Sequence, residues 1–121
     1  MAFSAGSKYS DGGVVNQTSA ALTLTSADSG KVYRINVADC IVALPATEMG
    51  LFYHFIVDTV SSSTGCSLSP VAADNINGGT DNKDLINTPG TDVKGDSVTL
   101  IGDGSEGWLT MSMHGIWAEE S

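Results

Sequence analysis

The chain has 121 residues, of which 41% are hydrophobic and 16% charged, and five basic against fourteen acidic residues give a formal net charge of -9. A chain of this length forms one domain around one core. The acidic balance argues against nucleic acid and anionic membranes as partners, because both attract clustered lysine and arginine. No basic, apolar leader and no run long enough to span a bilayer is present, so we expect a soluble chain that is not exported.

Residues 1–20 are rich in Gly, Ser and Ala and contain only a few apolar residues. This composition predicts an N-terminal arm that orders on contact with a partner, followed by a single β domain over residues 21–121. The apolar residues that would anchor the arm are Phe3, Tyr9, Val14 and Val15.

From residue 21 onward, apolar residues recur at every second position, and Gly, Ser, Asp, Asn and Thr interrupt the pattern at intervals. This spacing predicts an all-β fold, either an antiparallel β-sandwich or a small, jelly-roll-like β-barrel. The first expected hairpin joins strand 21–25 to strand 31–37 through a turn at 26–30. The expected inward side chains of these two strands are Leu22, Leu24, Tyr33, Ile35 and Val37.

Residues 40–45 predict a short strand that ends at Pro45, because proline cannot donate to a β-ladder. A loop over residues 46–50 leads to 51–57, the most apolar run of the chain. A strand that is apolar on both faces is usually covered on both sides, so we expect another subunit to provide one cover, with Phe52 and His54 in the contact.

The remainder begins with a short strand at 66–70 and an irregular stretch rich in turn-forming residues. A second hairpin is expected from residues 97–101 and 108–113, joined by a glycine-rich turn. Trp117 and an acidic tail follow, and Trp117 is a further expected interface residue.

Several short motifs imitate catalytic or binding sequences. Residues 102–107 read GxGxxG, but a dinucleotide site needs a following helix, and none is predicted. Residues 65–69 are close to the GxSxG turn of hydrolases, yet they lack its final glycine and its α/β context. His54 and His114 could act as general bases in principle, but packed or interfacial histidines are the simpler interpretation. We therefore expect no catalytic residue and no enzyme activity.

Metal and cofactor chemistry is equally weakly indicated. The loop at 74–84 contains several Asp and Asn residues but departs from the calcium-loop pattern at Ile76. We therefore prefer an ordinary turn to a bound cation as its interpretation. Cys40 and Cys66 are either free buried thiols, the preferred interpretation, or a disulfide between neighbouring strands. We expect no cofactor and no metal.

The ordered set DSGKVYRI, LP, MGLFYHFIV, DNING, GDSVTLIGDG and HGIW resembles a module of tailed-phage virion proteins. It occurs in small capsid decoration, or cement, proteins and in parts of tail fibres. The resemblance covers about Leu22 to Trp117 and implies a β-sandwich or barrel, commonly trimeric, without catalytic residues.

The resemblance leads to two functional expectations. The first, favoured because the chain holds little besides the module, is a decoration protein on the outer capsid surface, assembled in the host cytoplasm, which self-associates and bridges major capsid subunits. The alternative is a tail-associated or surface module that binds a glycan on the host.

Overall fold

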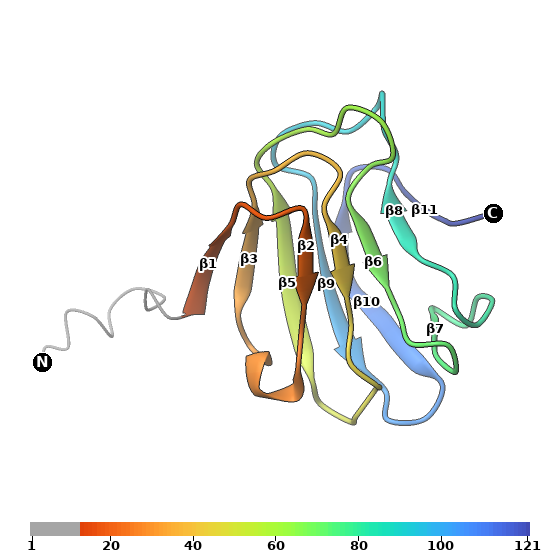
Figure 1. The fold of residues 1–121 in the computed structure, drawn as a ribbon. Coiled ribbons are helices and arrows are strands. Elements are labelled where there is room, and N and C mark those ends of the chain that lie inside the picture. The colour runs from red at the N-terminus through yellow and green to blue at the C-terminus, as the bar shows by residue number, and fades with distance from the viewer. Residues whose placement is uncertain (1–12) are drawn as a thin grey trace, which may run out of the picture.

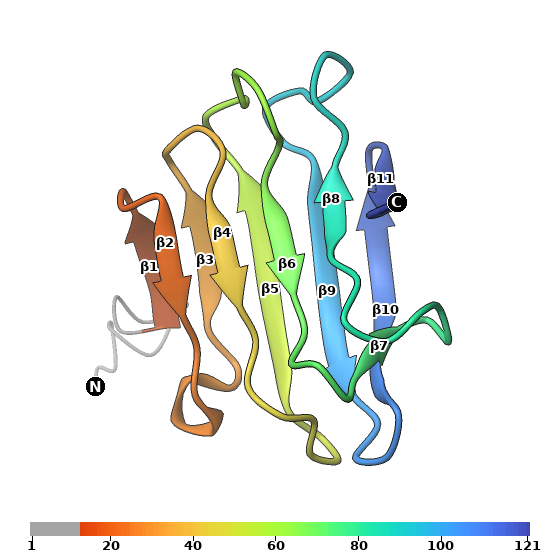
Figure 2. The same ribbon diagram turned by 45° about the vertical axis from the view of Figure 1, so that its right-hand side comes forward.

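The computed structural model describes residues 13–121, which form eleven strands arranged as two facing sheets (Figure 1). In a view turned by 45°, strands of the two sheets alternate across the picture (Figure 2). The six-stranded sheet comprises, in spatial order, β1 (Val14–Gln17), β3 (Val32–Ile35), β5 (Phe52–Val57), β9 (Ser97–Gly102), β10 (Gly107–His114) and β7 (Asn75–Ile76). The five-stranded sheet comprises β11 (Trp117–Glu119), β8 (Leu85–Asn87), β6 (Ser67–Ser69), β4 (Ile41–Ala43) and β2 (Ala21–Thr23).

The first six strands alternate between the two sheets, and each of the first four pairs in parallel with the strand two places further along the chain. Thus β1, β3 and β5 form one parallel set, and β2, β4 and β6 form the other. The all-β sandwich prediction is confirmed, but the expectation of purely antiparallel pairing is wrong for this half. The barrel alternative is also wrong, because the described strands form two separate sheets.

The prediction of a first hairpin, from strands 21–25 and 31–37, is also wrong. Strands β2 and β3 lie in different sheets, and a 3-10 turn at Ser26–Asp28 carries the chain from one layer to the other. Each strand has one apolar face, and facing strands across a core satisfy that pattern as well as neighbours within one sheet do. The alternation of residues therefore predicts the strands without fixing their partners.

In the second half of the chain, the long strands pair antiparallel with one another. Strands β9 and β10 form the predicted hairpin, with a register shift between Thr110 and Ser112, and β9 also pairs antiparallel with β5. Asp103 Oδ1 fixes the connecting turn by accepting N–H groups from Ser105, Glu106 and Gly107 at 2.7–2.9 Å. The GxGxxG sequence is therefore a hairpin turn in the structure.

The core lies between the sheets and is built from the inward residues of both. Tyr53 and Trp108 pack with ring centroids 5.7 Å apart, and Tyr33 and Phe55 stack at 5.8 Å. Such aromatic pairs add to the stabilisation that burial of apolar surface provides. The fully buried side chains also include Ile35, Val42, Val57, Leu68, Val98 and Leu100.

Both cysteines belong to this core as free thiols. Burial raises the pKa of Cys40, and burial together with the neighbouring Cys40 raises the pKa of Cys66 to about 12. The two thiols therefore remain protonated at neutral pH in the folded protein.

Two expectations about chain organisation need correction. Val14–Gln17, placed in the predicted arm, forms β1 at the edge of the six-stranded sheet, with its register fixed by pairing to β3. The supposedly irregular stretch contains β7 and β8, which are too short to show a periodic pattern. Phe3 and Tyr9 lie outside the described residues.

Candidate functional site

The outer face of the six-stranded sheet carries three rows of side chains across neighbouring strands. The first row is Phe52, Ile101 and Leu109. The second is Val14, Val32, His54, Thr99 and Ser112. The third is Asn16, Arg34, Ile56, Ser97 and His114. We call these thirteen residues the outer A face.

Six of the thirteen residues of the outer A face are apolar, and several of these are open to solvent. Val14 and Ile56 are each 39% exposed and Leu109 is 47% exposed, and these three belong to different strands. None of the thirteen residues is acidic, although the chain has fourteen acidic residues. A face with large apolar side chains and no carboxylate favours contact with another protein surface.

The centre of the outer A face is polar and fixed by hydrogen bonds. His54 Nδ1 and Thr99 Oγ1 are hydrogen-bonded at 2.8 Å, and Ser112 Oγ donates to Thr99 Oγ1 at 3.1 Å. The Phe52 ring meets the His54 imidazole edge to face at 5.3 Å. These contacts hold the imidazole in one orientation, but the face offers no carboxylate to pair with it as in a catalytic triad.

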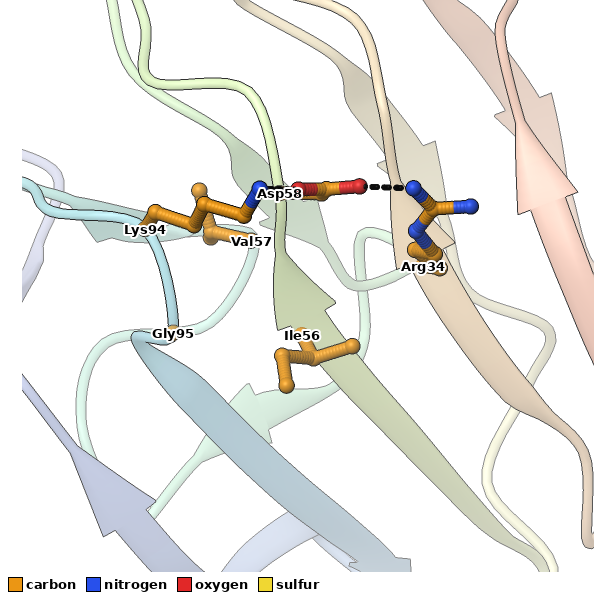
Figure 3. A pocket seen from close by; sticks show the side chains of 6 residues that line it. All are labelled: Arg34, Ile56, Val57, Asp58, Lys94 and Gly95. Carbon is orange, nitrogen blue, oxygen red and sulfur yellow. Dashed lines mark ion pairs between the residues drawn. The ribbon is translucent and has the colours of Figure 1, made fainter.

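One end of the face carries a cluster of charges (Figure 3). Arg34 from β3 and Lys94 from the segment before β9 reach Asp58 from opposite sides, at 2.5 Å and 2.9 Å. A hydrogen bond from Lys94, followed by one from Arg34, lowers the pKa of Asp58 below its ordinary value. We call these three residues the basic cluster, because two cations share a single carboxylate.

The basic cluster borders a hollow of about 280 Å³. Its apolar side is formed by Ile56 and Val57, and Ile56 is the register neighbour of Arg34 in the third row. The Arg34 side chain is 49% exposed and that of Lys94 is 77% exposed. Each retains N–H donors beyond those directed at Asp58, so the hollow can accept an anionic group.

The predicted interface residues divide between surface and core. Val14, Phe52 and His54 lie together on the outer A face, whereas Val15 lies beside inward Tyr33 and packs against the core. Trp117 is also buried, because β11 pairs with β8, and its Nε1 donates to the carbonyl of His114 at 3.0 Å. Val15 and Trp117 therefore lie away from the outer A face, and their interface role stays a prediction.

The residues of the candidate site that sequence reasoning missed include Arg34, Ile56 and Leu109. The alternation within β5 places residues 52, 54 and 56 on one face, and this signal could have found Ile56. Leu109 follows from the same rule, applied to the strand after inward Trp108.

The other motifs serve the fold. Ser67, in the hydrolase-like sequence, is buried within β6. Asp74, in the loop considered as a cation site, is buried and accepts the backbone N–H of Thr47 at 2.9 Å, while Asp81 accepts the side-chain N–H of Asn75 at 3.1 Å. Within residues 13–121, no group of three or more His, Cys, Asp or Glu side chains is arranged to hold a metal ion.

The fold is therefore an all-β sandwich whose six-stranded sheet exposes large apolar side chains on its outer face. No protein-family model, curated protein or solved structure matches the chain. In the part of the chain that the structure describes, no helix is long and apolar enough to cross a membrane.

Proposed function

We propose that this chain is a structural protein of a bacteriophage particle, specifically a capsid decoration protein. In this role it associates with identical copies, as a trimer, and bridges neighbouring major capsid subunits on the outer surface of the shell. The observation that carries the proposal is the outer A face, whose rows combine exposed apolar side chains with no carboxylate. The ordered sequence resemblance to phage virion modules supplies the biological setting.

The physical basis is burial of side chains that the isolated chain leaves in contact with water. Val14, Ile56 and Leu109 each retain more than a third of their surface exposed. Complete burial of a side chain of this kind contributes roughly 1.5–3 kcal/mol relative to full exposure. Contacts of that size, repeated at every copy around a shell, stabilise the assembled particle by mass action.

Glycan binding is the alternative, and the positions of the aromatic residues favour it less. A sugar-binding module needs accessible aromatic rings with polar side chains around them. Tyr33, Tyr53, Trp108 and Trp117 are all buried, and Phe52 is half-buried on the outer A face. A catalytic function has still less support among residues 13–121, since His54 has no carboxylate partner on its face.

The test uses particles of the phage that carries this chain, prepared without it and then supplemented with purified protein. We expect added wild-type protein to bind and to raise the temperature at which the particles release DNA. The variant Ile56→Glu/Leu109→Glu should not bind, because it places two charges on the outer A face. A matched variant, Ile41→Glu, changes the opposite sheet and should bind like wild type.

Two results would contradict the proposal. Unchanged DNA release after saturating addition of wild-type protein would remove the decoration role. Binding of the purified protein to host cells or extracted glycans, with no binding to particles, would establish the alternative.

A further inference from the structure

We infer that the basic cluster receives an acidic edge from a second copy of this chain. The acidic edge consists of Asp81, Asp84, Glu119 and Glu120, where the segment between β7 and β8 meets β11. This inference rests on the proposed function in assuming self-association, and it adds which surfaces meet.

The charges of the two surfaces are opposite. In the basic cluster, Arg34 and Lys94 against Asp58 leave one net positive charge. The acidic edge has four carboxylates and one nearby cation, Lys83, and therefore three net negative charges. Lys31, the other cation of the described residues, already forms an ion pair with Asp28. Opposite potentials of this kind select both partner and orientation.

The acidic edge is held together by the backbone despite its charge. The N–H of Asp84 donates to Glu120 Oε1 at 3.0 Å, and the N–H of Glu120 donates to the carbonyl of Asp84 at 2.8 Å. Burial, together with the nearby Glu120, raises the pKa of Asp84. A cation from a neighbouring copy would relieve the repulsion that contributes to this shift.

The two surfaces belong to different parts of one molecule. The basic cluster lies at one end of the outer A face, beside β3 and β5, whereas the acidic edge includes β11, the outermost strand of the other sheet (Figure 2). A contact between unlike surfaces of identical copies is heterologous, and it closes into a ring when the rotation between copies permits. Such a ring agrees with the proposed trimer.

The hollow beside the cluster suits a carboxylate-bearing side chain. Arg34 and Lys94 provide N–H donors for the carboxylate, and the exposed surface of Ile56 provides an apolar contact for the methylene groups. Arginine in particular can bind a carboxylate through two parallel hydrogen bonds.

A charge-swap experiment tests the pairing. Lys94→Glu changes the net charge of the basic cluster from +1 to -1. The double variant Asp81→Lys/Glu120→Lys changes the net charge of the acidic edge from -3 to +1. We expect each variant to weaken self-association at low salt by at least about tenfold, measured by sedimentation equilibrium. The chain carrying all three substitutions should recover to within about threefold of wild type, because the charges are opposite again.

Matched controls place the same charge changes elsewhere. Glu48→Lys changes an exposed residue in the loop between β4 and β5, and Lys31→Glu changes a residue before β3. Both should associate like wild type. Circular dichroism establishes that each variant is folded, and Asp81→Lys alone replaces the double variant if the latter is not folded, since Asp81 accepts one exposed side-chain hydrogen bond.

The outcomes separate this inference from the proposed function. If Leu109→Glu abolishes association while Lys94→Glu and the edge variant leave it unchanged, the pairing is wrong and the proposed function stands. Failure of the triple variant to recover also overturns the pairing. A wild-type chain that stays monomeric at all concentrations and does not bind particles refutes both.

Discussion

The outer faces of the two sheets both lack carboxylates in their rows of paired residues, but they differ in the size of their side chains. The outer face of the five-stranded sheet, here the outer B face, is built mostly from small side chains, and its one large exposed residue is Ile41, at 53%. Its members are Ala21, Ile41, Ser67, Ile86 and Ala118 in one row and Thr23, Ala43 and Ser69 in the other.

This difference shows that the absence of acidic charge does not by itself define an interface. Small side chains on three-residue strands present little apolar area to a partner. The outer A face combines larger apolar side chains with a fixed polar centre and a cluster of cations at one end. Apolar area, hydrogen-bonding groups and charge together characterise a specific protein interface.

The largest expected effect comes from the same substitution on each face. Ile56→Glu places a charge on the outer A face and should weaken self-association by at least about thirtyfold, since loss of a central interface residue costs about 2 kcal/mol or more. Ile41→Glu introduces the same charge on the outer B face and should change association by less than about threefold. Sedimentation equilibrium measures both values.

The comparison would be reversed if Ile41→Glu had the larger effect, because the outer B face would then be the interface. Equal and small effects from both variants would mean that neither face is buried between copies. Circular dichroism at the protein concentrations used should show wild-type secondary structure for both.

A second, intermediate effect concerns the loops that support the five-stranded sheet. Asp39 precedes β4 and holds the loop before β6, its Oδ1 accepting N–H groups from Ser63, Thr64 and Gly65 at 3.0–3.2 Å. The hydroxyl of Ser62 donates to its Oδ2, and this bond, followed by those backbone bonds, lowers the pKa of Asp39 to about 2.

Because the folded-state pKa lies below the ordinary value of 3.8, ionised Asp39 stabilises the fold above pH 3.8. That contribution is lost as the pH falls from 3.8 through about 2. Asn has a similar size and tolerates the positive φ of 58° at this position, so Asp39→Asn removes mainly the charge. We expect the variant to melt a few degrees lower at pH 7.

Thermal unfolding between pH 5 and pH 2 checks this prediction. The difference between wild type and Asp39→Asn should shrink across that range, while the self-association of the folded variant at neutral pH stays unchanged. A difference in stability that is independent of pH would show that the carboxylate charge has no part in holding the loop.

The sequence predicts side-chain direction better than it predicts which strands are neighbours. Alternation identifies Tyr33 and Ile35 as inward, and it finds the 97–113 hairpin because a short turn forces its strands together. It could not show that β2 and β3 belong to different sheets, since an inward face looks the same in either arrangement.

The candidate site could be predicted from the sequence only in part, for the same reason. Phe52 and His54 are predicted from one apolar strand, and the structure places both on the outer A face. The basic cluster is not visible in sequence, because Arg34, Asp58 and Lys94 come from separate segments that only the pairing of β3, β5 and β9 brings together. The burial of Trp117 could not be predicted, because the pairing of β11 with β8 is likewise invisible in sequence.

The smallest expected effect comes from the polar centre of the outer A face. Thr99→Val keeps the shape of a buried, β-branched residue but removes the oxygen that contacts His54 and Ser112. We expect a loss of about 1 kcal/mol in the free energy of unfolding, as for a typical hydrogen bond. Self-association should weaken by less than about fivefold, because the apolar surface of the face remains. Denaturant titration and sedimentation equilibrium measure the two quantities.

A matched control on the outer B face is Ser67→Ala, which removes the hydroxyl of a residue that is likewise 6% exposed. It should change neither quantity measurably. If Thr99→Val weakens association as strongly as Ile56→Glu does, the orientation of His54, rather than apolar burial, dominates the contact. The difference between the two faces would then lie in their hydrogen-bonded centres, and the size of their apolar side chains would be secondary.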